Sequence, residues 1–395
     1  MQLECAECVP DNMPVVTSHR AHNGTITVPS GDEVELSCAP GRFVAFPLRR
    51  DLRARCLAAR YVVPPAAPPA APPAARPRHL LELGCQESVF EDVLHQVDHC
   101  GAPYQGRLYQ MREPDSHGVL HLAAVCYDED RAVSLRLHAT NAPRNRLALP
   151  PHEEHEAPLS ILGNFNHMFD AKTRHDAEKL YSDDVRMNRR LHELLKHDKV
   201  SFAAQKLTSA KLLSRRYFED QNMRVTEFVS NKVAVWESVA AGNLRHLQLD
   251  VAKFLEASRP QRVDVVAGTH GVLAMRAGHG RADVWLRAGR FPVPRYLWTV
   301  VHARAQRAAL ALVLLNDPLV AVSEIKAAVF CDSACGGVAW LHELRRHRNY
   351  ECPAQGLVFC CHLHNFTAHV PELPADLIQV DAGAGGMLTD LFAPV

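Results

Sequence analysis

One stretch of the chain, residues 202–248, concentrates the side chains best suited to act on or bind a phosphodiester. Four of its seven Lys and Arg residues are candidates for binding phosphate: Lys206, Lys211, Arg215 and Arg216. Lysine and arginine attract phosphate groups through charge and hydrogen bonds. The stretch therefore predicts a nucleic-acid-binding surface, and the alternative, surface charges around a filled cleft, stays open at this point.

Basic residues also accumulate over longer spans, although Lys plus Arg and Asp plus Glu are balanced at 44 each. Residues 186–216 hold nine basic and two acidic residues, a balance of +7, and residues 259–307 repeat these numbers. Both spans are candidates for a phosphate-binding surface, or are solvated faces of separate elements. The 23 histidines add positive charge only in a mildly acidic compartment, because the unperturbed pKa of histidine is about 6.5.

Two strands and a helix are expected to position these side chains. FAAQKL, from Phe202, precedes the strand-like RVTEFVSN, and VWESVAAGNL then leads into a helix over Ala241–Ala257. An apolar stripe predicts that this helix is buried: Leu244, Leu247, Val251, Phe254 and Leu255. A helix is also predicted over Arg174–Lys199, with its apolar face formed by Leu180, Met187, Leu191, Leu194 and Leu195.

The overall pattern predicts an α+β fold with a central antiparallel sheet and flanking helices. Residues 1–150 are expected to form a cysteine-rich β region with a Pro/Ala-rich insertion at 61–77, and residues 151–395 a second domain. The longest apolar run, AALALVLL before Asn316, is much shorter than the ~20 residues of a membrane span. It predicts a buried strand or short core helix, and no membrane association is expected.

The 12 cysteines lie at both ends of the chain and leave residues 127–330 free of cysteine. This distribution favours disulfides that staple two regions, as in secreted proteins. Zinc is the weaker alternative, because Cys5-x-x-Cys8 and Cys331-x-x-x-Cys335 have no partner pair at finger distance. Sequons at Asn23 and Asn365 agree with secretion. The N-terminal residues show no apolar core of a signal peptide. If the protein is secreted, we therefore expect that this sequence is a processed form or that its first residue is misassigned.

Several segments together resemble the DNA/RNA non-specific endonucleases, in particular their secreted, disulfide-bearing animal branch. They are VDVVAGTHGVL, PVPRYLWTVV, LNDP and the pattern from Cys335 to Pro374, within a likeness spanning roughly residues 30–375. The resemblance implies a ββα-metal motif in residues 202–248. In that family a histidine is the general base, an asparagine binds a hydrated magnesium, a glutamate supports the metal waters, and arginines stabilise the transition state.

The resemblance assigns those roles to residues of different chemistry in this chain. Lys206 stands at the histidine position, Ala240 at the metal asparagine and Gln248 at the glutamate, while Asn231 keeps an upstream asparagine. The neighbouring Arg and Gly positions hold Ala204 and Gln205, and the register is held by Trp236, Gly242 and Asn243. A methyl group cannot ligate magnesium, and a lysine with a reference pKa of about 10.4 is protonated at neutral pH.

Three functional hypotheses follow. The first is a secreted, catalytically degenerate endonuclease relative that needs no cofactor and still binds DNA or RNA. The second is an active magnesium-dependent endonuclease, with Asn231 or Glu237 near the metal and His246 as base. The third is an interaction protein that uses the nuclease fold as a scaffold. The sequence predicts no oligomeric state.

Overall fold

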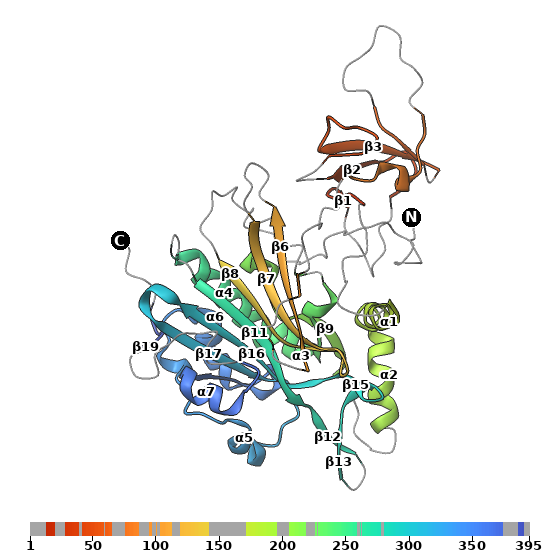
Figure 1. The fold of residues 1–395 in the computed structure, drawn as a ribbon. Helices are drawn as coiled ribbons and strands as arrows, with labels where there is room; N and C mark the ends of the chain where they lie inside the picture. Colours follow the sequence, from red (N-terminus) through yellow and green to blue (C-terminus); the bar gives the residue numbers. More distant parts are fainter. Residues whose placement is uncertain are drawn as a thin grey trace. The chain divides into compact units, whose positions relative to one another are not determined.

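The computed structural model (Figure 1) describes residues 13–19, 28–38, 42–58, 60–64, 76–86, 95–96, 100, 103–112, 119–141, 171–195, 205–218, 226, 228–258, 261, 263–277, 280–373 and 386–390. The chain divides into two compact units. The first comprises residues 1–95, 109–121 and 150–175, and the second residues 96–108, 122–149 and 176–395.

The first unit contains a four-stranded antiparallel sheet. Its strands, in spatial and sequence order, are β1 (Val15–Val16), β2 (Glu33–Ser37), β3 (Asp51–Leu57) and β4 (Arg60–Val62). Strict alternation in β3 buries Leu52, Ala54 and Cys56 and leaves the residues between them exposed, which gives the sheet one apolar face. A disulfide joins Cys38 to Cys85 in this unit. Most of the Pro/Ala-rich insertion lies outside the described residues.

A nine-stranded sheet forms the centre of the second unit. Its order is β18 (Val358–Cys361), β17 (Ala308–Leu315), β16 (Pro294–Ala303), β11 (Val263–Val272), β8 (Val133–Asn141), β7 (Val119–Asp128), β6 (Gln105–Arg112) and β5 (His95–Gln96), and β19 (Gly386–Met387) pairs with β17 in parallel. The pairs from β7 to β18 are antiparallel. The predicted α+β class with a central antiparallel sheet is confirmed.

The strands β7 and β8 lie in this central sheet, whereas the sequence analysis placed them in the cysteine-rich region before residue 150. Ala139 of β8 pairs with Val265 of β11, so β8 lies next to β11 inside the central sheet. Buried residues recur along β8, including Leu137 and Ala139. Period-two alternation shows that a segment is a strand, but does not show which strand it pairs with.

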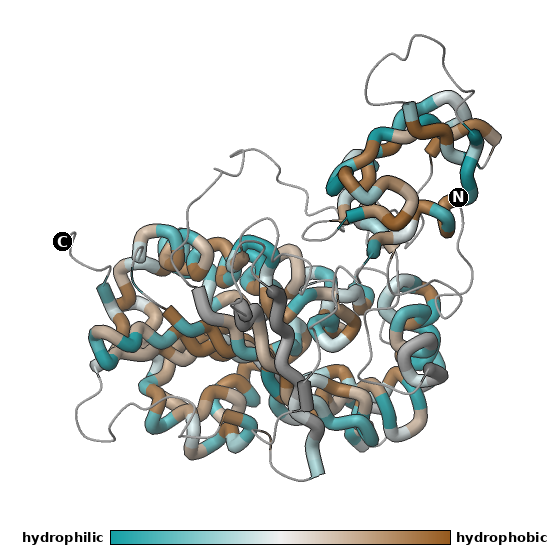
Figure 2. Tube along the Cα trace, turned by 45° about the horizontal axis from the view of Figure 1, so that its top comes forward, coloured by the Kyte–Doolittle hydropathy of each residue, from teal (hydrophilic) through white to brown (hydrophobic). Residues whose placement is uncertain are grey.

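The centre of the sheet is buried on both faces. All eight residues of β17 are buried, which confirms that AALALVLL is a core strand. One face packs against helices α5 (Val322–Ala328) and α7 (Leu363–His369) through a cluster that includes Trp298, Phe359 and Phe366. Figure 2 shows apolar residues along the strands and mixed hydropathy along the helices.

The strand, strand and helix predicted for residues 202–248 are present, with different boundaries. Strand β9 (Leu207–Lys211) pairs antiparallel with β10 (Lys232–Trp236), and the chain continues through α3 (Glu237–Val239) and the irregular η7 (Ala240–Leu244) into α4 (Arg245–Ala257). The second strand is therefore KVAVW rather than RVTEFVSN, because Val229–Asn231 forms a tight turn, η6. The predicted apolar stripe of the helix is buried at all five positions.

The segment predicted as one helix over Arg174–Lys199 forms two, α1 (Ala171–Tyr181) and α2 (Asp184–Leu195). Asp183 separates them, because its carboxylate accepts hydrogen bonds from the backbone N–H groups of Val185 and Arg186 at the start of α2. The predicted apolar residues Leu180, Met187 and Leu191 are buried.

Two short hairpins and a small helix complete the second unit. The hairpins are β12 (Ala274–Ala277) with β13 (Gly280–Asp283), and β14 (Trp285–Arg287) with β15 (Arg290–Pro292). Helix α6 (His342–Arg345) packs against α4, with the rings of Trp340 and Phe254 4.6 Å apart. Across the described helices, none combines the length and apolar character of a membrane span.

Among the described residues, the second unit contains three disulfides in addition to the bond between Cys38 and Cys85. They join Cys100 to Cys126, Cys331 to Cys361 and Cys335 to Cys360. The last two tie the segment after α5 to strand β18 at the edge of the central sheet. The expectation of disulfides near both ends of the chain is confirmed, and the zinc alternative at Cys331 and Cys335 is excluded by their pairing.

Candidate functional site

The β9–β10 hairpin places Lys206 beside the start of the helix that follows. The carbonyl of Lys206 accepts a 2.8 Å hydrogen bond from the N–H of Glu237, which extends the strand ladder one residue beyond the pair Leu207 and Trp236. Lys206, to which the resemblance assigns the position of the catalytic histidine, thus directly precedes strand β9 and lies beside Glu237, the first residue of α3.

The side chain of Lys206 is held by two carboxylates. Its Nζ lies 3.1 Å from Oδ2 of Asp184 and 3.4 Å from Oε1 of Glu237. The hydrogen bond to Asp184, followed by the negative charges of both carboxylates, raises the pKa of Lys206 above its usual value. A lysine with a raised pKa stays protonated at neutral pH, so it cannot accept a proton from water.

Asp184 reaches this position because helix α2 is fixed to strand β9. The buried side-chain amide of Asn188 donates a 2.8 Å hydrogen bond to the carbonyl of Leu207 and accepts a 2.7 Å bond from its N–H. Sequence reasoning identified neither Asp184 nor Asn188 as part of this arrangement. The available signal was a polar residue, Asn188, directly beside the buried Met187 on a helix whose other buried residues are apolar.

Ala240 lies in the irregular segment that joins α3 to α4. Gly242 departs from helical geometry with ψ of −119°, and a Cβ built there would lie 2.8 Å from the Cβ of Gln355. The close approach of residue 355 thus requires glycine and bends the start of the helix. Ala240 is half-buried and presents only a methyl group at this bend.

Gln248 uses its amide as a donor to the backbone. Its Nε2 donates a 2.8 Å hydrogen bond to the carbonyl oxygen of Lys211 at the end of strand β9. A carboxylate in the same place would face that carbonyl with two acceptors and no donor. The side chain at 248 therefore connects α4 to β9.

Asn231 is fully buried and its amide bonds only to backbone. Its Oδ1 accepts from the N–H of Leu213 at 2.8 Å, and its Nδ2 donates to the carbonyls of Leu213 and Thr226, both at 2.9 Å. Asn243, also fully buried, donates to the carbonyls of Asn349 and Gly356, each at 2.7 Å. Both asparagines hold loops in place.

The residues considered as an alternative catalytic set are also engaged. Nδ1 of His246 lies 3.3 Å from Oδ1 of Asn243, and burial lowers the pKa of the imidazole below its usual value. A neutral imidazole is chemically able to act as a base. The carboxylate of Glu237 is paired with the ammonium of Lys206 at 3.4 Å.

The donor set does not fit a hydrated magnesium ion. Magnesium requires oxygen ligands, usually carboxylates, whereas the three corresponding positions supply an ammonium, a methyl group and an amide donor. No group of three or more His, Cys, Asp or Glu side chains with metal-binding geometry occurs among the residues that the structure describes.

The structure distributes the four predicted cationic residues along strand β9 and beyond it. Lys206 directly precedes strand β9 and Lys211 is its last residue, so about 17 Å of extended chain separates them. Arg215 and Arg216 follow in the tight turn η4 (Arg215–Tyr217), which packs against α4. The four residues therefore form an extended basic border rather than one compact anion site.

One curated protein that is similar to this chain is an endonuclease. The chain is 22% identical over 300 residues to a salivary endonuclease of Lutzomyia longipalpis, a match that covers 73% of this chain. It spans 66% of the relative, just under two thirds of that protein's length. This similarity confirms the resemblance to the DNA/RNA non-specific endonucleases. No protein-family model matches the chain.

The chain is also similar to a solved structure described as an EndoG/EndoGI complex in a study of EndoG inhibition. The similarity has a TM-score of 0.34 and 10% sequence identity, and covers 69% of this chain and 89% of that chain.

Proposed function

We propose that this protein is a catalytically degenerate relative of the non-specific endonucleases, which binds DNA or RNA without hydrolysing it. The arrangement around Lys206 carries the proposal. A protonated amine, fixed between Asp184 and Glu237, stands where the resemblance places a general base.

The residues at two further positions, 240 and 248, support the loss of hydrolysis. Ala240 offers no oxygen to a metal, and the amide of Gln248 is committed to the carbonyl of Lys211. The alternative of an active magnesium enzyme places Asn231 or Glu237 near the metal. The side chain of Asn231 is fully buried with three backbone hydrogen bonds. Freeing it would cost those bonds and open the core beside it.

Binding to nucleic acid is supported by the basic border of Lys211, Arg215 and Arg216. These residues lie on β9 and η4, at the end of the strand away from the carboxylates of Asp184 and Glu237. Lys206 contributes little to this binding, since the carboxylates of Asp184 and Glu237 already neutralise its charge. An extracellular location is supported by four disulfides, which persist in oxidising compartments.

The test uses the purified, oxidised protein with fluorescent double-stranded DNA and RNA, in magnesium or in chelator. The wild type is expected to bind both polymers in a salt-sensitive manner and to cut neither. A triple variant, Lys206→His, Ala240→Asn and Gln248→Glu, restores the three side chains of the family and is expected to gain magnesium-dependent cleavage.

Each result decides between hypotheses. Cleavage by the wild type only with magnesium would overturn the proposal in favour of an active enzyme. Absence of both binding and cleavage would favour an interaction protein that uses the fold as a scaffold. Binding without cleavage, lost in high salt, supports the proposal.

A further inference from the structure

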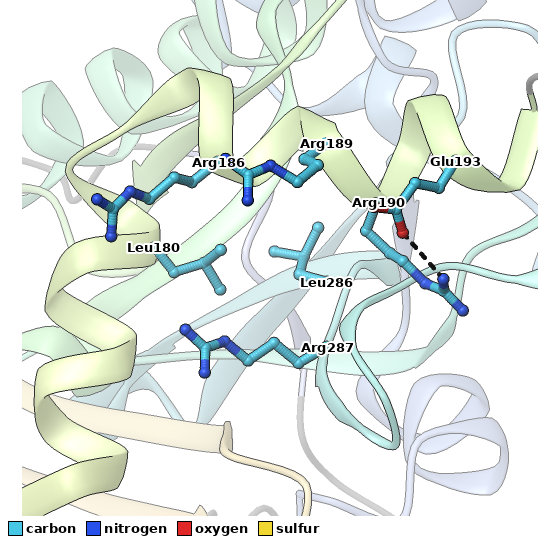
Figure 3. Close-up of a pocket in the computed structure, with 7 residues that line it drawn as sticks. All are labelled: Leu180, Arg186, Arg189, Arg190, Glu193, Leu286 and Arg287. Carbon is cyan, nitrogen blue, oxygen red and sulfur yellow. Dashed lines mark hydrogen bonds and ion pairs between the residues drawn. The ribbon is translucent and has the colours of Figure 1, made fainter.

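A pocket lined mainly by arginines lies between helices α1 and α2 and strand β14. It has a volume of about 460 Å³ and is lined by Leu180, Arg186, Arg189, Arg190, Glu193, Leu286 and Arg287. Four guanidinium groups and one carboxylate thus surround one cavity (Figure 3). We propose that this pocket binds one phosphate-bearing nucleotide unit of a nucleic-acid strand, an inference that rests on the proposed binding of DNA or RNA.

The arginines differ in how they are paired. Arg190 pairs with Glu193 at 3.1 Å, Arg186 with Asp183 at 2.9 Å and Arg287 with Asp176 at 2.6 Å. Arg189 has no carboxylate partner within the described part of the chain. With these partners counted, the pocket keeps one positive charge, and Arg189 supplies it.

The existing ion pairs do not prevent an anion from binding. The side chains of Arg186, Arg190 and Arg287 are 43–49% exposed, so their pairs with carboxylates are largely screened by water. A guanidinium has five N–H donors and can keep one carboxylate while it donates to a phosphate oxygen. Figure 3 places Arg186, Arg189 and Arg287 around Leu180 at one end of the pocket, away from the pair of Arg190 and Glu193.

The walls and size of the pocket favour a nucleotide over a bare phosphate. Leu180 and Leu286 are buried and supply apolar surface between the guanidinium groups. A cavity of about 460 Å³ falls within the usual range for small organic ligands. The guanidinium planes can also stack on a base, which is a common way to hold single-stranded nucleic acid.

Helix α2 connects this pocket with the site around Lys206. Its residues Asp184 and Asn188 contact Lys206 and strand β9, whereas Arg186, Arg189 and Arg190 line the pocket. The two sites are thus served by the same helix, and an α-helix with its side chains is about 10–12 Å wide. A strand bound along β9 can therefore reach the pocket within a few nucleotides.

The experiment measures binding of fluorescent single-stranded DNA and RNA by the full chain as salt is raised. The double variant Arg189→Gln and Arg287→Gln is expected to bind about 5- to 50-fold more weakly. The slope of log affinity against log salt should also become shallower by about 0.7 for each phosphate that is no longer neutralised. The matched control is Arg276→Gln. Arg276 is an exposed arginine of strand β12, outside the pocket, and it is paired with Glu324 of α5. The control variant is expected to bind like the wild type.

A variant that binds more tightly shows that weaker binding by the arginine variants is not caused by misfolding. Glu193→Gln removes the acid of the pocket and releases Arg190, so it should bind about 2- to 5-fold more tightly, consistent with one exposed charge pair. If the wild type binds nucleic acid but all pocket variants match it, the pocket proposal is overturned and the proposed function stands. If the wild type binds neither polymer, the proposed function fails as well. Equal loss of binding to heparin and to nucleic acid would identify a general polyanion site and overturn the nucleotide assignment.

Discussion

Two sets of residues within the ββα motif differ in burial and in role. Asn231 and Asn243 are fully buried, and their amides hydrogen-bond to backbone groups of neighbouring loops. Lys206, Ala240 and Gln248 are exposed or half-buried and stand where the resemblance places the chemistry. The first set maintains the motif, whereas under the proposed function the second set no longer supports hydrolysis, so the motif would persist without the reaction.

The difference has a physical basis. Replacing a buried amide leaves several backbone groups without partners, and each unsatisfied group costs free energy of folding. Replacing a half-exposed side chain leaves groups that water can satisfy. The predictions below test this contrast, beginning with the largest expected effect.

Asn231→Ala should be the most damaging of these substitutions. It leaves one N–H and two carbonyl groups without their partners in a site that is 0% exposed. We expect a loss of about 2–4 kcal/mol in the free energy of unfolding, measured by urea denaturation with disulfides intact. The control Asn365→Ala, at an exposed position of α7, should change it by less than about 0.5 kcal/mol. Similar losses in both variants would contradict the assigned role of Asn231.

Gly242→Ala should have a smaller effect through overpacking. The added Cβ would lie 2.8 Å from the Cβ and 2.9 Å from the carbonyl oxygen of Gln355, so the backbone must shift. We expect a loss of about 1–3 kcal/mol in a denaturation experiment. Gly337→Ala is a matched control, because nothing lies within 4 Å of its Cβ. A neutral Gly242→Ala would show that the bend before α4 is not set by residue 355.

His246 should make stability depend on pH in one direction. Burial lowers the pKa of its imidazole below the usual 6.5, so the unfolded chain binds more protons in the window just below that value. This contribution is present above the usual pKa and is lost as the pH falls through the folded pKa. His246→Gln should reduce the difference in denaturation midpoint between pH 7.5 and pH 5.5, two values about one unit either side of the usual pKa. If the variant instead lost more stability than the wild type between pH 7.5 and pH 5.5, the assigned direction of the pKa shift of His246 would be contradicted.

Lys206→Met should have the smallest effect on stability. The lysine and both carboxylate partners are about half exposed, so water and salt replace the ion pairs. We expect an unchanged thermal midpoint in salt of about 0.5 M, where exposed pairs are screened. A large destabilisation would place Lys206 with the buried, structural set and would remove the contrast on which the proposed function rests.

The arginine pocket is a site that the sequence predicted only in part. The basic span 186–216 was visible as a local excess of charge, and Arg186, Arg189 and Arg190 belong to it. Arg287 joins them from β14, about a hundred residues later along the chain. Charge counting could not establish this, because the packing of the hairpin against α2 decides which arginines share a cavity.

The sequence by itself determined the α+β class, the buried strand over AALALVLL, the apolar stripe of the helix at 241–257 and the endonuclease resemblance. These features follow from the order of residues and from local periodicity, which any fold of this chain must satisfy. The tertiary structure alone decided that β7 and β8 join the central sheet and that Asp184 holds Lys206. Strand partners and ion pairs between distant segments depend on how faces pack, and the apolar pattern of one segment does not specify which other segment covers it.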